Sequence, residues 1–227
     1  RKDETMSDMQ KKQNFLQGTA LLAMATAIVK VIGALYKIPL NAIIGEQGFG
    51  YFNTAYDIYN VLLMISTAGL PVAMSRMISQ AGSLGHYNQV RRIYAAARGI
   101  FLGLGIGGSL LMTLFCRQLA DFQHQPDAWA AIGTLGPCVL LICVMSAFRG
   151  YFQGLENMLP TSVSQVLEAI VKLIVGIGAA AAVMKATGSV PLAAGGAILG
   201  VTASCLVSSL YLFAEFRGSY RFLPRSE

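Results

Sequence analysis

Six apolar stretches follow one another along the chain, each near the roughly 20 residues that an α-helix needs to cross a membrane. They cover Phe15–Tyr36, Tyr51–Ser79, Ile93–Phe115, Ala128–Phe148, Thr161–Met184 and Pro191–Phe213. Turns rich in glycine and proline separate them, and no strand-like alternation competes with this pattern. Because backbone groups in lipid must be hydrogen-bonded internally, the pattern predicts an all-α membrane protein with a six-helix transmembrane bundle.

The overall composition agrees with a membrane protein. Of the 227 residues, 55% are hydrophobic and 12% are charged, and the mean hydropathy is +0.57. Disordered chains combine low hydrophobicity with high charge, so disorder is excluded. An ordinary water-soluble domain is disfavoured as well, because so few charged side chains do not cover a globular surface.

Small residues recur at four-residue spacing in two of the predicted helices. The two stripes are Gly99, Gly103 and Gly107, and then Gly196, Gly200, Ser204 and Ser208. Small side chains let helix backbones approach closely in lipid. Both stripes are therefore predicted to be helix-packing faces.

Basic residues are distributed unequally over the two sides of the predicted bundle. With the amino terminus inside, the inner segments and span ends hold eleven of the 17 Lys and Arg residues, and the outer segments hold three. Because positive residues gather on the cytoplasmic side, both termini are predicted to be cytoplasmic. Residues 1–14 then form a cytoplasmic segment, 15–216 the transmembrane lobe, and 217–227 a basic tail or the start of an inter-lobe linker. The net charge of +6 follows from this bias, and no nucleic-acid partner is expected.

Three cations inside or near the ends of the spans are the strongest candidates for a binding site. Lys30 lies deep in the first predicted helix, Lys37 follows two turns later on the same face, and Arg76 lies near the cytoplasmic end of the second. A charge within a membrane is costly unless it is paired, faces a cavity or functions. The alternative for each is an interfacial anchor whose side chain reaches the membrane surface.

The second span carries a polar face followed by a helix-breaking sequence. Asn53, Tyr56, Asp57 and Asn60 recur at steps of three and four residues. This face fits either a water-filled cavity or a polar helix interface. Downstream, Gly69 and Pro71 predict a kink, which we interpret as a hinge.

A third polar group lies where the fourth and fifth spans meet. Its members are Arg149, Gln153, Gln165, Glu168 and Lys172. Glu168 precedes Lys172 by four residues, the favourable order for an ion pair on one helix. Mutual neutralisation of these two charges and a role in transport both stay open at this point.

No catalytic set or metal site is apparent in the sequence. The two histidines, His86 and His124, fall in predicted loops away from any nucleophile. The four cysteines fall in or beside apolar runs, without a CxxC motif. We therefore expect no enzymatic activity, no metal and no cofactor.

Three stretches of the chain form a pattern that is typical of one family of membrane proteins. They are Gly18–Leu22 with Lys30–Leu40, Ile44–Tyr59 with Ala68–Arg76, and Arg149–Gly154 with Pro160–Gln165 and Glu168. In these stretches the chain resembles the polysaccharide-exporting flippases of the multidrug/oligosaccharidyl-lipid/polysaccharide (MOP) superfamily, in the branch that contains stage V sporulation protein B and the lipid II flippases. The resemblance extends over about residues 11–216.

The resemblance implies a fold, a cargo and partners. Family members have two six-helix lobes around a cationic central cavity that opens alternately to each face of the bacterial plasma membrane. The implied cargo is a polyprenyl-diphosphate-linked oligosaccharide, such as a peptidoglycan or polysaccharide precursor, with Lys30, Lys37 and Arg76 facing the diphosphate. The chain then corresponds to the amino-terminal lobe of a MATE/MOP-type transporter, whose partner is a carboxy-terminal lobe of the same protein or a second copy.

Two other functions remain as alternatives. A multidrug or cation antiporter of the same superfamily would use Asp57 or Glu168 to bind an ion, although basic groups outnumber acidic ones within the spans. A non-transporting membrane scaffold would depend on the glycine stripes and not on the intramembrane cations.

Overall fold

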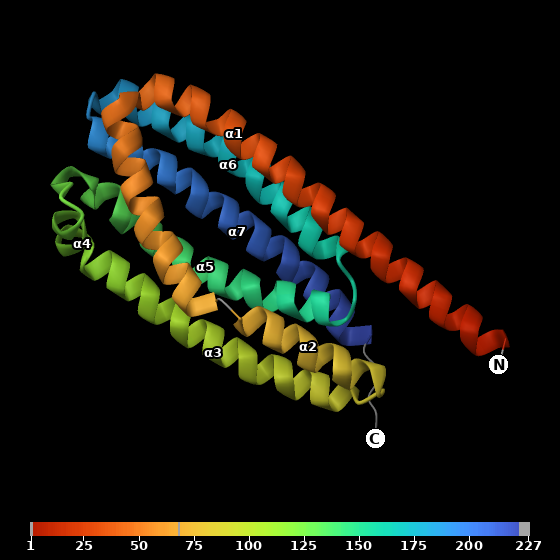
Figure 1. Cartoon of the computed structure of the whole chain (residues 1–227). Helices are drawn as coiled ribbons and strands as arrows, with labels where there is room; N and C mark the ends of the chain where they lie inside the picture. The colour runs from red at the N-terminus through yellow and green to blue at the C-terminus, as the bar shows by residue number, and fades with distance from the viewer. Residues whose placement is uncertain (1, 68, 223–227) are drawn as a thin grey trace.

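The structure is a computed structural model, which describes the backbone of residues 2–67 and 69–222 and the side chains of residues 16–61, 64 and 69–220 (Figure 1). Over these ranges the chain forms seven α-helices and one short 3-10 helix, without a strand. They are α1 (Lys2–Thr67), α2 (Leu70–Ser83), α3 (Tyr87–Leu114), α4 (Cys116–Phe122), η1 (Pro126–Ala128), α5 (Trp129–Gly154), α6 (Leu159–Thr187) and α7 (Val190–Phe222). The all-α prediction is confirmed for this part of the chain.

The long helix α1 contains a reversal of chain direction at Gly45. This residue has φ 70° and ψ 178°, which are not helical values. A positive φ is readily adopted by glycine because it has no Cβ. Figure 1 shows a first arm, residues 2–44, that follows α6, and a second arm, residues 46–67, that returns toward α2. The chain thus reverses at a single residue, whereas the sequence predicts a longer loop between Tyr36 and Tyr51.

The second predicted span, Tyr51–Ser79, is divided in two. Helix α1 ends at Thr67 and α2 begins at Leu70. Gly69 has φ 96°, and Pro71 lies in the first turn of α2, where its missing N–H leaves no helical hydrogen bond unmade. The sequence predicts a kink here, and the structure shows a complete break.

The predicted number of six membrane-spanning helices is not confirmed. In the described residues, five segments are long and apolar enough to cross a membrane. They are Leu16–Val61, Tyr87–Leu114, Pro126–Gly154, Leu159–Thr187 and Val190–Tyr220. The difference arises in α1, whose two arms form one apolar segment because the turn at Gly45 interrupts the helix at one residue only.

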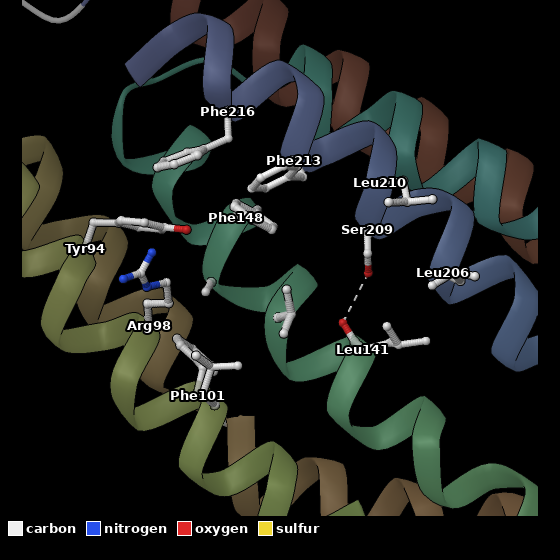
Figure 2. A pocket seen from close by; sticks show the side chains of 13 residues that line it. Tyr94, Arg98, Phe101, Leu141, Phe148, Leu206, Ser209, Leu210, Phe213 and Phe216 are labelled. Atoms are coloured by element: carbon white, nitrogen blue, oxygen red, sulfur yellow. Dashed lines mark hydrogen bonds between the residues drawn. The ribbon is translucent and has the colours of Figure 1, made fainter. Parts of the chain in front are cut away.

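Helix α5 forms the centre of the bundle and packs against α3 and α7. Three aromatic rings join these helices at one end (Figure 2): Tyr94 of α3 lies 4.6 Å from Phe216 of α7, and Phe148 of α5 lies 5.3 Å from Phe216, centroid to centroid. Offset and tilted ring pairs at these distances add to the stabilisation from burial.

The two small-residue stripes behave differently. The stripe on α7 is a packing face as predicted, because Gly200 lies directly against Gly176 of α6 and leaves no room for a Cβ. The stripe on α3 was predicted wrongly, since a Cβ on Gly99, Gly103 or Gly107 would meet open space. Helix α3 approaches α5 through Gly105 and Gly108 instead.

Candidate functional site: a polar network and two open arms

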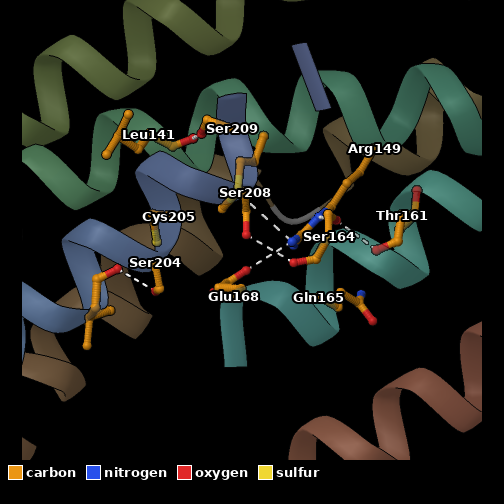
Figure 3. Close-up of polar contacts among 12 residues, drawn as sticks. Leu141, Arg149, Thr161, Ser164, Gln165, Glu168, Ser204, Cys205, Ser208 and Ser209 are labelled. Carbon is orange, nitrogen blue, oxygen red and sulfur yellow. Dashed lines mark hydrogen bonds and ion pairs between the residues drawn. The ribbon is translucent and has the colours of Figure 1, made fainter. Parts of the chain in front are cut away.

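A partly buried polar network joins α5, α6 and α7 (Figure 3). Arg149 of α5 forms an ion pair with Glu168 of α6, with 2.9 Å between Nη2 and Oε2. The Arg149 Nε–H also donates to Ser164 Oγ at 3.1 Å, and Ser164 Oγ donates to the carbonyl of Thr161 at 2.7 Å. Ser208 of α7 donates to the Ser164 carbonyl at 3.0 Å. Each of the three helices thus contributes to one connected set of hydrogen bonds.

The partner of Glu168 differs from the one considered at the sequence level. Within the described residues, the carboxylate is paired with Arg149 on the neighbouring helix and not with Lys172 on its own. The ammonium of Lys172 lies 5.9 Å from the ring centroid of Tyr36 on α1, a cation–π distance. The four-residue spacing favours a pair between Glu168 and Lys172 on one helix. Arg149 is the partner instead, because its guanidinium donates hydrogen bonds both to Glu168 and to Ser164.

Ser164 and Ser208 are members of this network that sequence reasoning did not select as site residues. A signal for Ser164 was present, because it precedes Glu168 by four residues and therefore lies on the same helix face. Ser208 was assigned to the small-residue stripe alone. Its hydroxyl bonds to a backbone carbonyl of another helix, which is a contact that no pattern in one helix reveals.

Gln165 connects α6 to the first arm of α1. Its Oε1 lies 3.5 Å from the hydroxyl of Thr26, which also donates to the carbonyl of Leu22 at 2.8 Å. The contact places Gln165 and Glu168 one turn apart on the side of α6 that lies between the arm and α5. The polar network and the α1 surface are therefore neighbours.

The first arm of α1 carries two distinct exposed stripes. The lysine stripe consists of Thr19, Thr26, Lys30, Lys37 and Asn41, all of which are exposed. The apolar stripe consists of Met24, Ile28, Val31, Leu35 and Ile38, each about half exposed or more. At 3.6 residues per turn the two stripes lie roughly a third of a turn apart. Lys30 and Lys37 do share a face, and that face is separate from the one covered with large apolar side chains.

The polar face predicted for residues 53–60 is only partly formed. Asp57 and Asn60 are exposed and Asn53 is half-buried. Tyr56 packs its ring between Phe52 and Tyr59, with centroid distances of 5.0 and 5.6 Å. The exposed polar surface of the second arm thus consists of Asn53, Asp57 and Asn60, because aromatic packing turns Tyr56 toward its neighbours.

Arg76 of α2 is exposed and lines a cleft of about 460 Å³. Gln153, at the end of α5, lines the same cleft together with Glu156. The structure thus brings together Arg76 and Gln153, which the sequence places in separate groups. Lys30 and Lys37 lie on another helix, α1. Gly69 and Pro71 lie at the α1–α2 break, a few residues before Arg76 in the sequence.

The described residues contain no group of three or more His, Cys, Asp or Glu side chains placed to hold a metal ion. The arrangement is suited to a different chemistry, in which fixed cations and amides contact a solute without forming a bond to it. Exposed ammonium and guanidinium groups are complementary to phosphate oxygens. Partly buried ion pairs between helices are suited to holding those helices in register.

Solved structures share this helical arrangement. The crystal structure of a MATE protein in the bent conformation superimposes with a TM-score of 0.76 at 17% sequence identity, over 92% of this chain and 46% of the other. The chain therefore shares the fold of the MATE structures, over about half of their length.

Sequence comparison identifies the family. A profile described as "Polysaccharide biosynthesis protein" matches residues 15–226. Stage V sporulation protein B of Bacillus subtilis is 30% identical over 91% of this chain, and the lipid II flippase MurJ of the same organism is 29% identical over 86%. The chain belongs to the polysaccharide biosynthesis protein family. It spans about two fifths of the length of these two relatives, 40% and 39%.

Proposed function

We propose that the chain forms one lobe of a transporter that flips a polyprenyl-diphosphate-linked oligosaccharide across the bacterial plasma membrane. In this proposal residues 15–216 are the lobe, residues 217–227 are a basic cytoplasmic tail or the start of an inter-lobe linker, and both termini are cytoplasmic. The opposing wall of the cavity comes from a second lobe, in the same protein or in a second copy. Alternating access arises when the two lobes rock against each other around the cargo.

The observation that carries this proposal is the separation of the two stripes on the first arm of α1. Large apolar side chains occupy one exposed face, as expected for contact with acyl chains. Lys30 and Lys37 occupy another, together with hydroxyl and amide groups. A cation that only reached toward the membrane surface would not need a polar stripe around it. The stripe fits a water-filled cavity between lobes.

The chemistry of the cargo explains why such a cavity would be cationic. A diphosphate does not cross hydrocarbon without compensation, because burying an unpaired charge is very costly. Ammonium and guanidinium groups supply charge-assisted hydrogen bonds to phosphate oxygens. Lys30, Lys37 and Arg76 would hold the diphosphate, while Asn53, Asp57, Asn60 and Gln165 offer hydrogen bonds to sugar hydroxyls. The polyprenyl tail stays in the lipid.

The test is a translocation assay on the full-length protein that carries this chain, reconstituted in liposomes with a fluorescent polyprenyl-diphosphate oligosaccharide. The double variant Lys30→Gln, Lys37→Gln removes two cations and keeps polar side chains. We expect the translocation rate to fall at least about tenfold, since each charged hydrogen bond to phosphate contributes on that scale.

The matched control is Lys185→Gln, an exposed lysine in the last turn of α6. It makes the same chemical change at the far end of another helix and should leave the rate unchanged. Equal translocation by the double variant and the wild type, at equal amounts of inserted protein, would refute the cationic cavity.

A further inference from the structure

A groove on the other side of the bundle, between α3, α5 and α7, has a composition unlike that of the α1 surface (Figure 2). Its volume is about 350 Å³. The lining is mostly aliphatic and aromatic, and its polar side-chain atoms belong to Tyr94, Arg98 and Ser209. The Ser209 hydroxyl is directed at the carbonyl of Leu141, 3.4 Å away. The body of the groove therefore presents hydrocarbon to any occupant.

The groove opens toward the outside of the bundle. The side chains along its rim are exposed by about a third to three fifths: Leu102 of α3, and Leu206, Leu210 and Phe213 of α7. From Leu206 to Phe216 the α7 wall extends ten residues, which is about 15 Å at helical rise. An elongated, carbon-lined groove of that length, open on one side, is shaped for a hydrocarbon chain lying along the helices.

One end of the groove is cationic. Arg98 lines it, and Figure 2 shows the guanidinium beside the hydroxyl end of Tyr94. The guanidinium carbon of Arg217 lies 5.6 Å from the ring centroid of Phe213, which also lines the groove. The nearby carboxylate on α7 is Glu215, and across the part of the chain that the structure describes neither arginine forms an ion pair. Two guanidinium groups are therefore available to an anion at this end.

We propose that this groove binds an anionic glycerophospholipid. One acyl chain lies against Val144 and Phe148 of α5, and the phosphate is held at the cationic end by Arg98, assisted by Arg217. Charge complementarity selects an anionic headgroup, and the carbon lining selects an amphiphile over a free phosphate. The site is independent of the transport cavity, because it lies among α3, α5 and α7 and shares no residue with the lysine stripe.

A lipid-linked oligosaccharide fits this groove less well than a phospholipid. Among the 13 lining residues shown in Figure 2 there is no amide and no carboxylate to bind sugar hydroxyls. Arg98 and the neighbouring Arg217 are complementary to a phosphate, but the lining offers no amide or carboxylate to a large sugar head.

The experiment measures lipid selectivity of the full-length protein by native mass spectrometry from mixed micelles of phosphatidylglycerol and phosphatidylcholine. We expect the wild type to retain phosphatidylglycerol preferentially, and Arg98→Gln to lower that preference at least about fivefold. The control Arg92→Gln removes an exposed arginine of the same helix that does not line the groove, and it should keep the preference.

A second measurement locates the lipid and does not depend on the arginine variant. Phosphatidylglycerol with a diazirine on its acyl chain should label peptides of α5 and α7, and Val144→Phe, which fills the groove, should reduce that labelling several-fold. Equal retention of both lipids by the wild type, or labelling unchanged in Val144→Phe, would overturn the proposal. Displacement of the labelled lipid by an equimolar polyprenyl diphosphate would also overturn it, by assigning the groove to the transported lipid.

Discussion

The first arm of α1 and the trio α5–α7 are both apolar, but they differ in how much of their surface is covered by the rest of the chain. In the most apolar stretch of the α1 segment 6% of the residues are buried. In the trio the share is 61% in the η1–α5 segment and 50% in α7, and it falls to 17% in α6, which packs against the first arm. The trio joins Arg149, Glu168, Ser164 and Ser208 in one internal set of hydrogen bonds. The first arm leaves Lys30 and Lys37 exposed on its surface. We infer that one region provides stability and the other provides the surface for function.

The largest effect on stability is expected when one charge of the trio is removed. Glu168→Ala leaves Arg149 partly buried without its carboxylate, where its side chain is 21% exposed. Removing one partner of a buried pair costs about 3 kcal/mol. We expect the free energy of unfolding in detergent to fall by about that amount.

The control for that substitution is Glu215→Ala, which removes an exposed carboxylate from α7. It should change the free energy of unfolding by less than about 0.5 kcal/mol. A loss in Glu168→Ala no larger than in this control would show that the ion pair does not stabilise the trio.

The close approach of α6 and α7 is the next contact to test. Gly200→Ala introduces a Cβ against the backbone of Gly176, so the helices must separate. Overpacking of this kind costs about 2 kcal/mol, which thermal unfolding in detergent would measure. Gly99→Ala on α3 faces open space and should be neutral or slightly stabilising, since alanine favours the helix. Equal effects of the two substitutions would contradict the packing described for these glycines.

The smallest effect on stability is expected on the open arm. Lys30→Gln removes an exposed positive charge and should change the free energy of unfolding by no more than about 0.5 kcal/mol, while translocation falls. If Lys30→Gln unfolds the protein as readily as Glu168→Ala does, the lysine belongs to the scaffold and the division between the two regions fails.

Much of the fold could be predicted from the sequence, because span length and hydrophobicity are properties of the chain itself. The four later predicted spans each overlap an apolar helix, and the α1–α2 break falls at Gly69 and Pro71 as the turn residues predict. The turn at Gly45 was not predicted as a one-residue reversal, because a positive φ at a glycine has no hydrophobic signature. The short helix α4 was missed for its length.

The candidate site was less accessible to sequence reasoning. Patterns within one helix correctly place Lys30 and Lys37 on a common face, since that depends only on helical periodicity. The partner of Glu168 depends on the register between α5 and α6, which neither helix encodes alone. For the same reason, spacing marks Gly99 and Gly103 as a packing face although it does not reveal which side of α3 meets α5.

The central claim, that the lysine stripe faces water and the apolar stripe faces lipid, is tested most directly by cysteine accessibility in membranes. Lys30→Cys and Lys37→Cys would be compared with Val31→Cys and Leu35→Cys, with Cys116, the half-buried natural cysteine, replaced by serine. A membrane-impermeant maleimide should label positions 30 and 37 and leave 31 and 35 unlabelled. Equal labelling at all four positions, or labelling of 31 and 35 alone, would contradict the account.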